Sequence, residues 1–492
     1  MKLRRCAGPL GRIPAYRCLL SLLCLCGALQ PAVAVEPVAA KAPAKPAATS
    51  PGFINTWLRE QDTSFSVWDI GGQFRLRYEN KDNAGHVANR DFQKSRDNDN
   101  SHLLLREKVH VGYKPASWVN FYVEGRNSTV DFDKRPAPSP ETDKGDLHQA
   151  YVSLGDPKKF PVTLKAGRQE LLYGDERFVG IGDWSNNGRV FDAAKLRFEN
   201  DLLWVDAFIG RVIIPRDDPF NIANDYDWFS GLYASSRKPV PWQDTDLYFL
   251  SRNVGAGSPN AIATGVGGVT ARDIYTVGTR WKSLPEKLAR WDYSAEIAVQ
   301  FGSINAAGGR LEHKAISADA TLGYTWAKAH GAPRLGVGYT YASGDADPND
   351  KENRTFEGLF GTNHRFYGLM DLWGLRNVHS GRVVASWKPW KPLTLSSEYH
   401  LVWLAEGNDF FYPESGAGRT GNGYGRNPRF SRFVGSELDI IGSYTLKTFG
   451  DLQLGYGRFF VGDYIKQSAQ SLPANGGAVD ANWAYVQLRI NL

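Results

Sequence analysis

Cysteine is missing from almost the whole of this chain. All four cysteines of the 492-residue sequence lie within its first 26 residues, at Cys6, Cys18, Cys24 and Cys26. Methionine is almost as scarce, with two residues in total. Disulfide bonds, thiol catalysis and cysteine-ligated zinc are therefore excluded for everything beyond that first segment.

Net charge is nearly absent once the N-terminal segment is set aside. Five of the 58 lysines and arginines fall in residues 1–34, which hold no acidic residue, so 53 basic residues face 52 acidic ones over the rest. A protein that binds nucleic acid through its phosphates needs a basic excess. The composition gives such a partner no support, and we expect no nucleic acid.

Long apolar runs are also lacking beyond residue 34, so no transmembrane helix is predicted there. Residues 1–34 have instead the pattern of a secretory signal peptide: a basic start, an apolar stretch at 18–29 and a small-x-small cleavage site at 32–34. A lipoprotein signal is the alternative, because Cys24 and Cys26 lie in the apolar stretch. Each of them, however, follows a leucine where a lipobox needs a small residue.

The segment that follows, residues 35–69, begins with an Ala/Pro/Lys tract at 37–52. Such a tract cannot bury enough apolar surface to fold. We therefore expect a flexible periplasmic N-terminal arm over 35–69.

Aromatic residues and glycine, by contrast, are abundant: the chain has 15 Trp, 22 Tyr, 25 Phe and 51 Gly. From about residue 70 onward, apolar and polar residues alternate with a period of two. In the last segment one face holds Ala484, Val486, Leu488, Ile490 and Leu492, and the other holds Trp483, Tyr485, Gln487, Arg489 and Asn491. Alternation with many aromatic residues is typical of a β-barrel whose lipid band is built from every second residue.

Eighteen alternating segments can be counted. They start near residues 70, 102, 117, 146, 160, 191, 202, 227, 244, 272, 290, 313, 332, 376, 391, 433, 450 and 482. The connections after even-numbered segments are short and rich in turn residues, whereas those after odd-numbered segments are long, including 80–101, 128–145, 171–190, 343–375 and 405–432. A soluble β-sandwich has no reason to alternate in this way.

Short and long connections in strict alternation are typical of outer-membrane barrels, with short periplasmic turns and long external loops. The sequence thus predicts an all-β chain that forms an antiparallel transmembrane barrel of about 18 strands over 70–492. Both termini would lie in the periplasm of a Gram-negative bacterium. Outer-membrane lipid and lipopolysaccharide would surround the barrel.

Strand parity also assigns charged residues to the inner face. The expected basic wall consists of Arg75, Arg77, Arg106, Lys108, Arg126, Lys165, Lys195, Arg197 and, on the last segment, Arg489. The expected acidic wall consists of Asp292, Glu296, Asp319, Glu398, Glu437 and Asp439. Walls of opposite charge would orient and admit anions along the basic side. The alternative is that these charges only solvate the walls and pair across strands.

A motif stands in the long connection after the fifth segment. It reads Gly167-Arg-Gln-Glu-Leu-Leu-Tyr-Gly-Asp-Glu-Arg177, followed by Asp183-Trp-Ser-Asn-Asn-Gly-Arg-Val-Phe-Asp192. It resembles the signature of the alginate-export family of outer-membrane proteins. Segments 231–235 and 363–368 resemble later parts of that family, so the likeness spans residues 70–492. The resemblance implies an 18-stranded barrel, monomeric, with a basic constriction that passes an anionic polysaccharide.

This motif supplies a second group of candidate residues: Arg168, Tyr173, Asp175, Arg177, Asp183, Trp184 and Asp192. Strict parity puts Arg168 on the lipid-facing side, so it must lie near the rim or follow a bulge. Residues 167–192 could fold inward as a constriction loop, with pairing among Arg168, Asp175, Arg177, Asp183 and Arg189. A salt-bridge network that only holds the loop in shape is the compatible alternative.

Together these features favour a channel for passive, electrostatically guided passage of an anionic polysaccharide or oligosaccharide, with periplasmic export components as further partners. One alternative is a general or uptake porin for small anionic solutes. Another is a barrel enzyme or adhesin, although no Gly-x-Ser-x-Gly stands in the sequence. We expect no cofactor. We also expect no metal, because the acidic loop 344–353 lacks the EF-hand spacing of a calcium site.

Overall fold

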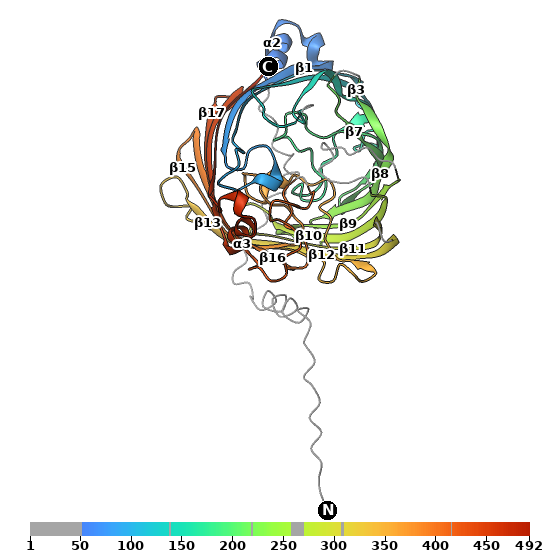
Figure 1. Ribbon diagram of the computed structural model, residues 1–492. Helices are drawn as coiled ribbons and strands as arrows, with labels where there is room; N and C mark the ends of the chain where they lie inside the picture. The colour runs from blue at the N-terminus through green and yellow to red at the C-terminus, as the bar shows by residue number, and fades with distance from the viewer. Residues whose placement is uncertain (1–51, 137–138, 218–219, 257–269, 307–308, 415) are drawn as a thin grey trace, which may run out of the picture. The chain divides into compact units, whose positions relative to one another are not determined.

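The computed structural model describes residues 52–136, 139–217, 220–256, 270–306, 309–414 and 416–492, and the expected signal peptide at 1–34 lies outside them. These residues form one closed antiparallel barrel (Figure 1). Its first nine strands are β1 (Trp68–Asp82), β2 (Asn100–Ala116), β3 (Val119–Asp131), β4 (Asp143–Leu154), β5 (Val162–Gln169), β6 (Phe191–Glu199), β7 (Leu203–Ile214), β8 (Ile222–Ser236) and β9 (Gln243–Val254). The others are β10 (Arg272–Ser283), β11 (Trp291–Ala306), β12 (Gly309–Thr325), β13 (Arg334–Ala342), β15 (Val378–Trp390), β16 (Leu393–Leu404), β17 (Phe433–Leu446), β18 (Gly450–Val461) and β19 (Ala481–Asn491).

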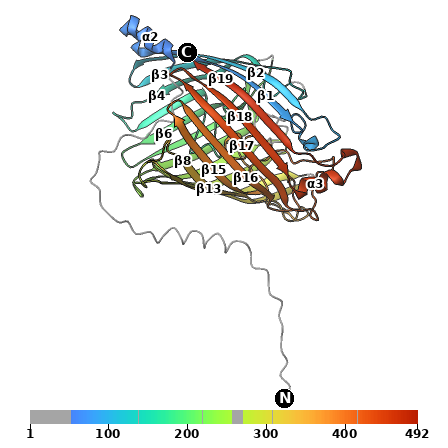
Figure 2. The ribbon, with the colours of Figure 1, turned by 90° about the vertical axis from the view of Figure 1, so that its left-hand side faces the viewer.

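The predicted barrel of 18 strands is confirmed. A further short strand, β14 (Glu352–Asn353), lies in the loop between β13 and β15 and pairs in parallel with β12. The barrel closes where β19 pairs with β1, from Gln73 opposite Asn491 to Asp82 opposite Asn482. In Figure 2 the long strands lie side by side and are tilted together, as strands of a closed barrel must be.

The connections follow the predicted alternation with two exceptions. Residues 215–221, between β7 and β8, are no longer than the turns after β4 and β10, with seven residues in each. The connection between β11 and β12 has only two residues, 307–308, so the expected strict alternation is wrong at this odd-numbered position. These two strands are also among the longest, with 16 and 17 residues. Residues that looked like loop in the sequence therefore extend this hairpin instead.

The outer surface of the barrel is an apolar band. On β13, for example, Leu335, Val337 and Tyr339 alternate with inward residues and are 45%, 58% and 50% exposed. At the end where the short turns lie, the exposed aromatic residues include Trp118, Phe160, Trp242, Trp291, Trp326 and Trp390. An apolar band bounded by aromatic residues matches the hydrocarbon core and interface of a membrane.

The helices are short and lie outside the strand pattern. They are α2 (Phe53–Gln61), η2 (Thr63–Val67), η3 (Ala88–Arg90), η5 (Asn363–Arg365), α3 (Asp463–Gln470) and η6 (Pro473–Asn475). None of these described helices is long and apolar enough to cross a bilayer. The flexible arm expected over 35–69 lies outside the described residues at 35–51. Beyond them the expectation needs correction, because 53–61 and 63–67 are helical and β1 begins at Trp68.

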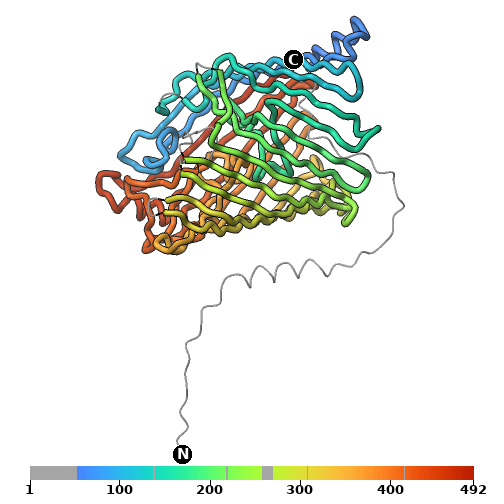
Figure 3. Tube along the Cα trace, turned by 90° about the vertical axis from the view of Figure 1, so that its right-hand side faces the viewer, coloured from blue at the N-terminus to red at the C-terminus, as the bar shows by residue number. Residues whose placement is uncertain are grey.

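The core of the molecule lies inside the barrel. The long connections 170–190 and 343–377 cross the interior of the ring (Figure 1), and Figure 3 shows the wall of tilted strands around them. They meet each other at a parallel bridge between Val179 and Phe360. Buried aromatic residues of these loops, such as Phe178 and Phe356, pack together and against the wall. The lumen is therefore shaped by loops as much as by strands.

Candidate functional site in the barrel lumen

Three arginines form a row across the seam of the barrel. Arg75 on β1 lies directly opposite Arg106 on β2 and also directly opposite Arg489 on β19. Like charges in direct opposition on neighbouring strands are destabilising. Such a row persists only where other groups compensate the charge.

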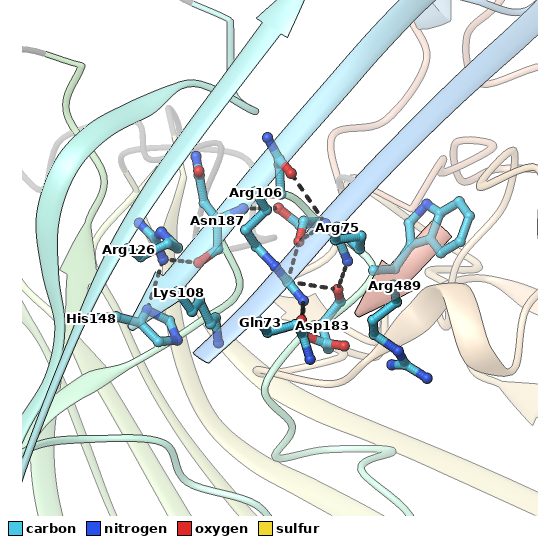
Figure 4. Close-up of polar contacts among 12 residues, drawn as sticks. Gln73, Arg75, Arg106, Lys108, Arg126, His148, Asp183, Asn187 and Arg489 are labelled. Atoms are coloured by element: carbon cyan, nitrogen blue, oxygen red, sulfur yellow. Dashed lines mark hydrogen bonds and ion pairs between the residues drawn. The ribbon is translucent and has the colours of Figure 1, made fainter. Parts of the chain in front are cut away.

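A loop supplies part of that compensation (Figure 4). Arg75 donates to the backbone oxygens of Asp183 and Ser185, at 2.5 and 3.1 Å. The guanidinium of Arg106 lies 2.9 Å from the Asp183 carboxylate. Burial by itself would raise the pKa of Asp183, but Arg106 and Arg75 outweigh it and hold that pKa well below its usual range. The Asp183 side chain therefore stays ionised and offsets part of the positive charge of the row.

Arg489 differs from the other two arginines of the row. It pairs with Asp451 on β18, at 2.7 Å from Nε and 2.6 Å from Nη2. Its side chain remains 30% exposed, whereas that of Arg106 is 1% exposed. Arg489 is thus the member of the row that a solute in the lumen can reach.

Arg77, next along β1, is occupied by the loop. It donates to the backbone oxygen of Trp184 at 2.8 Å, and its guanidinium lies 3.7 Å from the centre of the Trp184 ring. His364 stacks against the Trp184 ring at 4.0 Å. Both Arg77 and Trp184 therefore hold the loop in place, and Arg77, at 1% exposed, offers no surface to a solute.

Lys108 and Arg126 belong to a cluster that includes Glu124, His148 and Glu170. The carboxylates of Glu124 and Glu170 and the imidazole of His148 lie close enough together to hold a metal ion. Arg126, however, donates to Nδ1 of His148 at 2.8 Å, which leaves the proton on Nε2, facing Glu170 at 3.3 Å. The ammonium of Lys108 lies 3.5 Å from Glu124 and 3.8 Å from Glu170. The cluster is thus an ion-pair network whose imidazole has no lone pair left for a metal.

The remaining members of the basic wall lie on β5 and β6. Lys165 and Lys195 are directly opposite each other. Lys165 rests on the ring of Tyr151, 3.6 Å from its centre, and Lys195 lies 3.4 Å from Asp206. Arg197 pairs with the same Asp206 at 2.6 Å. Asp206 on the neighbouring strand β7 thus pairs with two of these three cations.

The acidic wall is divided between two groups. Asp319 and Glu296 are occupied by Arg177, which comes from the loop after β5 and lies 2.8 Å from the first and 3.3 Å from the second. Arg382 adds a second cation to Asp319 at 2.7 Å. Asp292, nearer the short turns, pairs with Arg334 at 2.5 Å. This group therefore holds the fold together.

The second acidic group lies on β16 and β17. Glu398 is directly opposite Asp439, and Glu437 precedes Asp439 by two residues on β17. Glu437 accepts from the backbone nitrogen of Met370 at 2.9 Å and from Trp373 Nε1 at 3.1 Å. Asp439 accepts from the backbone nitrogen of Leu369 at 3.2 Å. The hydrogen-bond partners of these two buried carboxyl groups are thus backbone and indole donors rather than cations.

The basic wall and the acidic wall meet at a cavity of about 490 Å³. Its charged lining consists of the cations Arg75, Arg365 and Arg489 and the acids Glu176, Asp183, Glu398 and Asp439, with His364 beside them. The basic and acidic walls are close neighbours here, because only β18 separates β17 from β19. A solute in the cavity therefore meets both signs of charge.

The pairing expected within the loop is not formed among Arg168, Asp175, Arg177, Asp183 and Arg189. Arg168 forms an ion pair with Asp192 at 2.9 Å and donates to the backbone oxygen of Asn221, at the loop end of β5. Asp175 instead pairs with Lys282 at 2.5 Å. The expected internal network is therefore wrong: the loop makes its ion pairs with the barrel wall.

Two further motif residues also make long-range contacts. Tyr173 donates to Asp206 at 2.9 Å. Arg189 donates to backbone oxygens of the loop after β13, including Gly361 at 3.3 Å. The motif thus connects β7 to the second luminal loop.

Sequence reasoning missed one charged cluster. Glu357, in the loop after β13, lies 3.1 Å from Arg252 on β9 and 2.8 Å from Arg272 on β10. Burial would raise the pKa of Glu357, but Arg272 and Arg252 lower it to about 2. The parity count used for the other strands would have placed both arginines inward. Their partner Glu357 lies in a loop, 85 or more residues away, and no periodic pattern in the sequence indicates this pairing.

Comparisons with known proteins complete the description. The family model described as alginate export matches residues 67–477. No curated protein matches the chain. Among solved structures, the chain is similar to Pseudomonas aeruginosa OccK11 (OpdR), with 14% identity, a TM-score of 0.51 and coverage of 87% of this chain and 96% of that one. It is equally similar to P. aeruginosa OpdK solved with vanillate, with 12% identity, a TM-score of 0.52 and coverage of 86% and 98%.

The solved neighbours support the barrel fold, and another structure of OpdK describes it as an outer membrane protein. The family match covers most of the barrel, including the motif loop and both luminal walls as far as β18. The chain belongs to the alginate export family of outer-membrane β-barrels.

Proposed function

We propose that the barrel is a channel for passive passage of an anionic polysaccharide or oligosaccharide, with both chain termini in the periplasm. The observation that carries this proposal is the arginine row at the β1–β19 seam, whose partly exposed member, Arg489, faces the luminal cavity. A guanidinium can hold a carboxylate in a bidentate geometry. Arg489 can therefore exchange its contact with Asp451 for a carboxylate of the passing chain.

The arrangement of charges supports release as well as binding. Asp183 and Asp451 neutralise two of the three charges of the row, so a passing carboxylate competes with them for the arginines. Conduction requires binding strong enough for entry and weak enough for exit. Glu398 on the neighbouring wall further opposes prolonged binding of an anion in the cavity. No energy source is needed for such a sequence of exchanges.

Single-channel recording in planar bilayers tests the proposal. We expect preference for anions and block of the current by an oligouronate at a roughly tenfold lower concentration than by a neutral oligosaccharide of equal length, the effect of one charge-assisted contact. Preference for cations, or equal block by both oligomers, would overturn it.

An uptake channel for small anionic solutes is a second candidate. Two observations favour it: the cavity of about 490 Å³ lies within the usual size range of small-molecule sites, and the similar OpdK was solved with vanillate. The same recordings separate the candidates. A small-solute channel would be blocked as well by a monomeric uronate as by the oligomer, whereas a polysaccharide channel favours the oligomer because it spans several contacts.

A further inference from the structure

Helix α2 is attached to the barrel by its polar side. Asn55 donates from Nδ2 to Asp69 Oδ1 at 2.6 Å and accepts at Oδ1 from the backbone nitrogen of Ile70 at 2.8 Å. Arg59 donates to the backbone oxygen of Trp68 at 2.8 Å. These three hydrogen bonds fix the helix beside the first residues of β1.

The apolar residues of α2 lie on another side of the helix. Phe53 and Trp57 are four residues apart and thus adjacent on one face, and they are 55% and 57% exposed. Ile54 and Leu58 continue this apolar face and are half-buried. A helix on a water-soluble surface normally turns its apolar face to the protein and its polar face outward. Here a polar side holds the protein and two large aromatic side chains point away from it.

The position of α2 identifies what those side chains meet. The helix precedes β1 at the end of the barrel where the short turns lie, and Figure 1 shows it outside the ring of strands. The aromatic belt that contains Trp118, Phe160 and Trp242 lies at this same end. Phe53 and Trp57 therefore continue an interface that the barrel already makes with lipid.

We propose that α2 is a membrane-interface anchor: it lies in the surface of the leaflet at the short-turn end, with Phe53 and Trp57 inserted between headgroups and acyl chains. Amphipathic helices of this kind bury their apolar face roughly 5–10 Å into that boundary. The anchor holds the chain against the membrane just before β1, next to the β1–β19 seam. This inference depends on the barrel spanning a membrane and not on its cargo.

The absence of cysteine after residue 34 permits a direct test. Residues 35–492 carrying Trp57→Cys, labelled with an environment-sensitive fluorophore, are refolded into vesicles whose lipids are brominated near the headgroup. Two matched variants serve as controls: Leu164→Cys on the outer face of β5 and Thr56→Cys on another side of α2. The label at 57 should be quenched by the brominated lipid, like the label at 164, and protected from aqueous iodide, unlike the label at 56.

Quenching of the label at 57 by iodide as strongly as at 56, without quenching by lipid, would show that this face meets water or protein and would overturn the proposal. If Trp57→Cys fails to fold, Phe53→Cys gives the same readout from the adjacent position. Each variant is recorded for conductance in parallel. A channel with unchanged selectivity but no lipid contact at 53 or 57 would sink the anchor alone and leave the proposed function standing.

Discussion

Arg75 and Arg489 lie directly opposite each other across the seam that closes the barrel. The first is 2% exposed and bonded to the loop after β5, whereas the second keeps a side chain that is 30% exposed beside the cavity. The same charge thus serves two purposes on adjacent strands. One arginine holds a loop in the lumen, and the other remains available to a solute.

Replacement of Arg489 by glutamine should weaken anion preference without unfolding the barrel. The change removes the exposed cation and leaves Asp451 without its partner, so the cavity becomes more acidic. We expect an increase of about tenfold in the oligouronate concentration that gives half-maximal block, the value of one charge-assisted hydrogen bond. Lys238→Gln, an equal change of charge in the short turn after β8, is the control and should leave block unchanged.

Loss of Arg177 should destabilise the barrel and release the loop after β5. Arg177→Met leaves Glu296 without its ion-pair partner and removes one of two cations from Asp319. Breaking a buried ion pair costs about 3–5 kcal/mol, measurable as a lower urea midpoint in vesicles together with noisier single-channel currents. Arg177→Lys should rescue little, because an ammonium cannot bridge two carboxylates as a planar guanidinium does.

The matched control for Arg177 is Arg365→Met in the other luminal loop. Arg365 is 53% exposed and pairs with Glu176 at 3.3 Å. Exposed pairs contribute about 0–1 kcal/mol, so the urea midpoint should hardly move. Equal destabilisation by both changes would contradict the structural role assigned to Arg177.

Stability should fall between about pH 5 and pH 8 through Glu414 in the loop after β16. Burial and the charge of Asp371 raise the pKa of Glu414 to about 7, against 4.5 in its ordinary state. The folded protein therefore binds this proton more tightly than the unfolded chain. Its stabilisation is complete below the ordinary pKa and is lost as pH rises through the folded one. Glu414→Gln should abolish this part of the pH dependence of the melting temperature; an unchanged slope would refute the assignment.

A charged residue introduced on the apolar outer band should lower the free energy of unfolding, and by more at the middle of the membrane than at its edge. Val337 lies in the middle of β13 and is 58% exposed on the outer face. Val337→Arg should lower the free energy of unfolding in vesicles by about 2–4 kcal/mol, whereas Leu202→Arg, in the short turn before β7, should cost about 0–1 kcal/mol. Equal costs at the two sites would mean that the band does not face lipid.

Much of this fold could be predicted from local patterns. The starts of all 18 strands lie within five residues of their expected positions, the largest difference being at Ile222 of β8. Alternation is a local property, because successive side chains of a strand point to opposite faces. The exceptions arise where alternation is ambiguous: the β11–β12 hairpin runs through residues that resembled a loop, and α2 lies in a segment whose composition resembled a linker.

The period-two alternation along the chain predicts the number of strands, the closure of the barrel through its last strand, and the inward direction of residues such as Arg75 and Arg489. The reason is that one face of each strand must meet lipid and the other water. The partner of each inward charge is decided only in the folded barrel. Arg177 reaches Asp319 and Glu296, and Asp183 reaches Arg106, across separations of 77 or more residues. The energy of a buried charge depends on the groups packed around it, and the path of the loops inside the barrel alone brings those groups together.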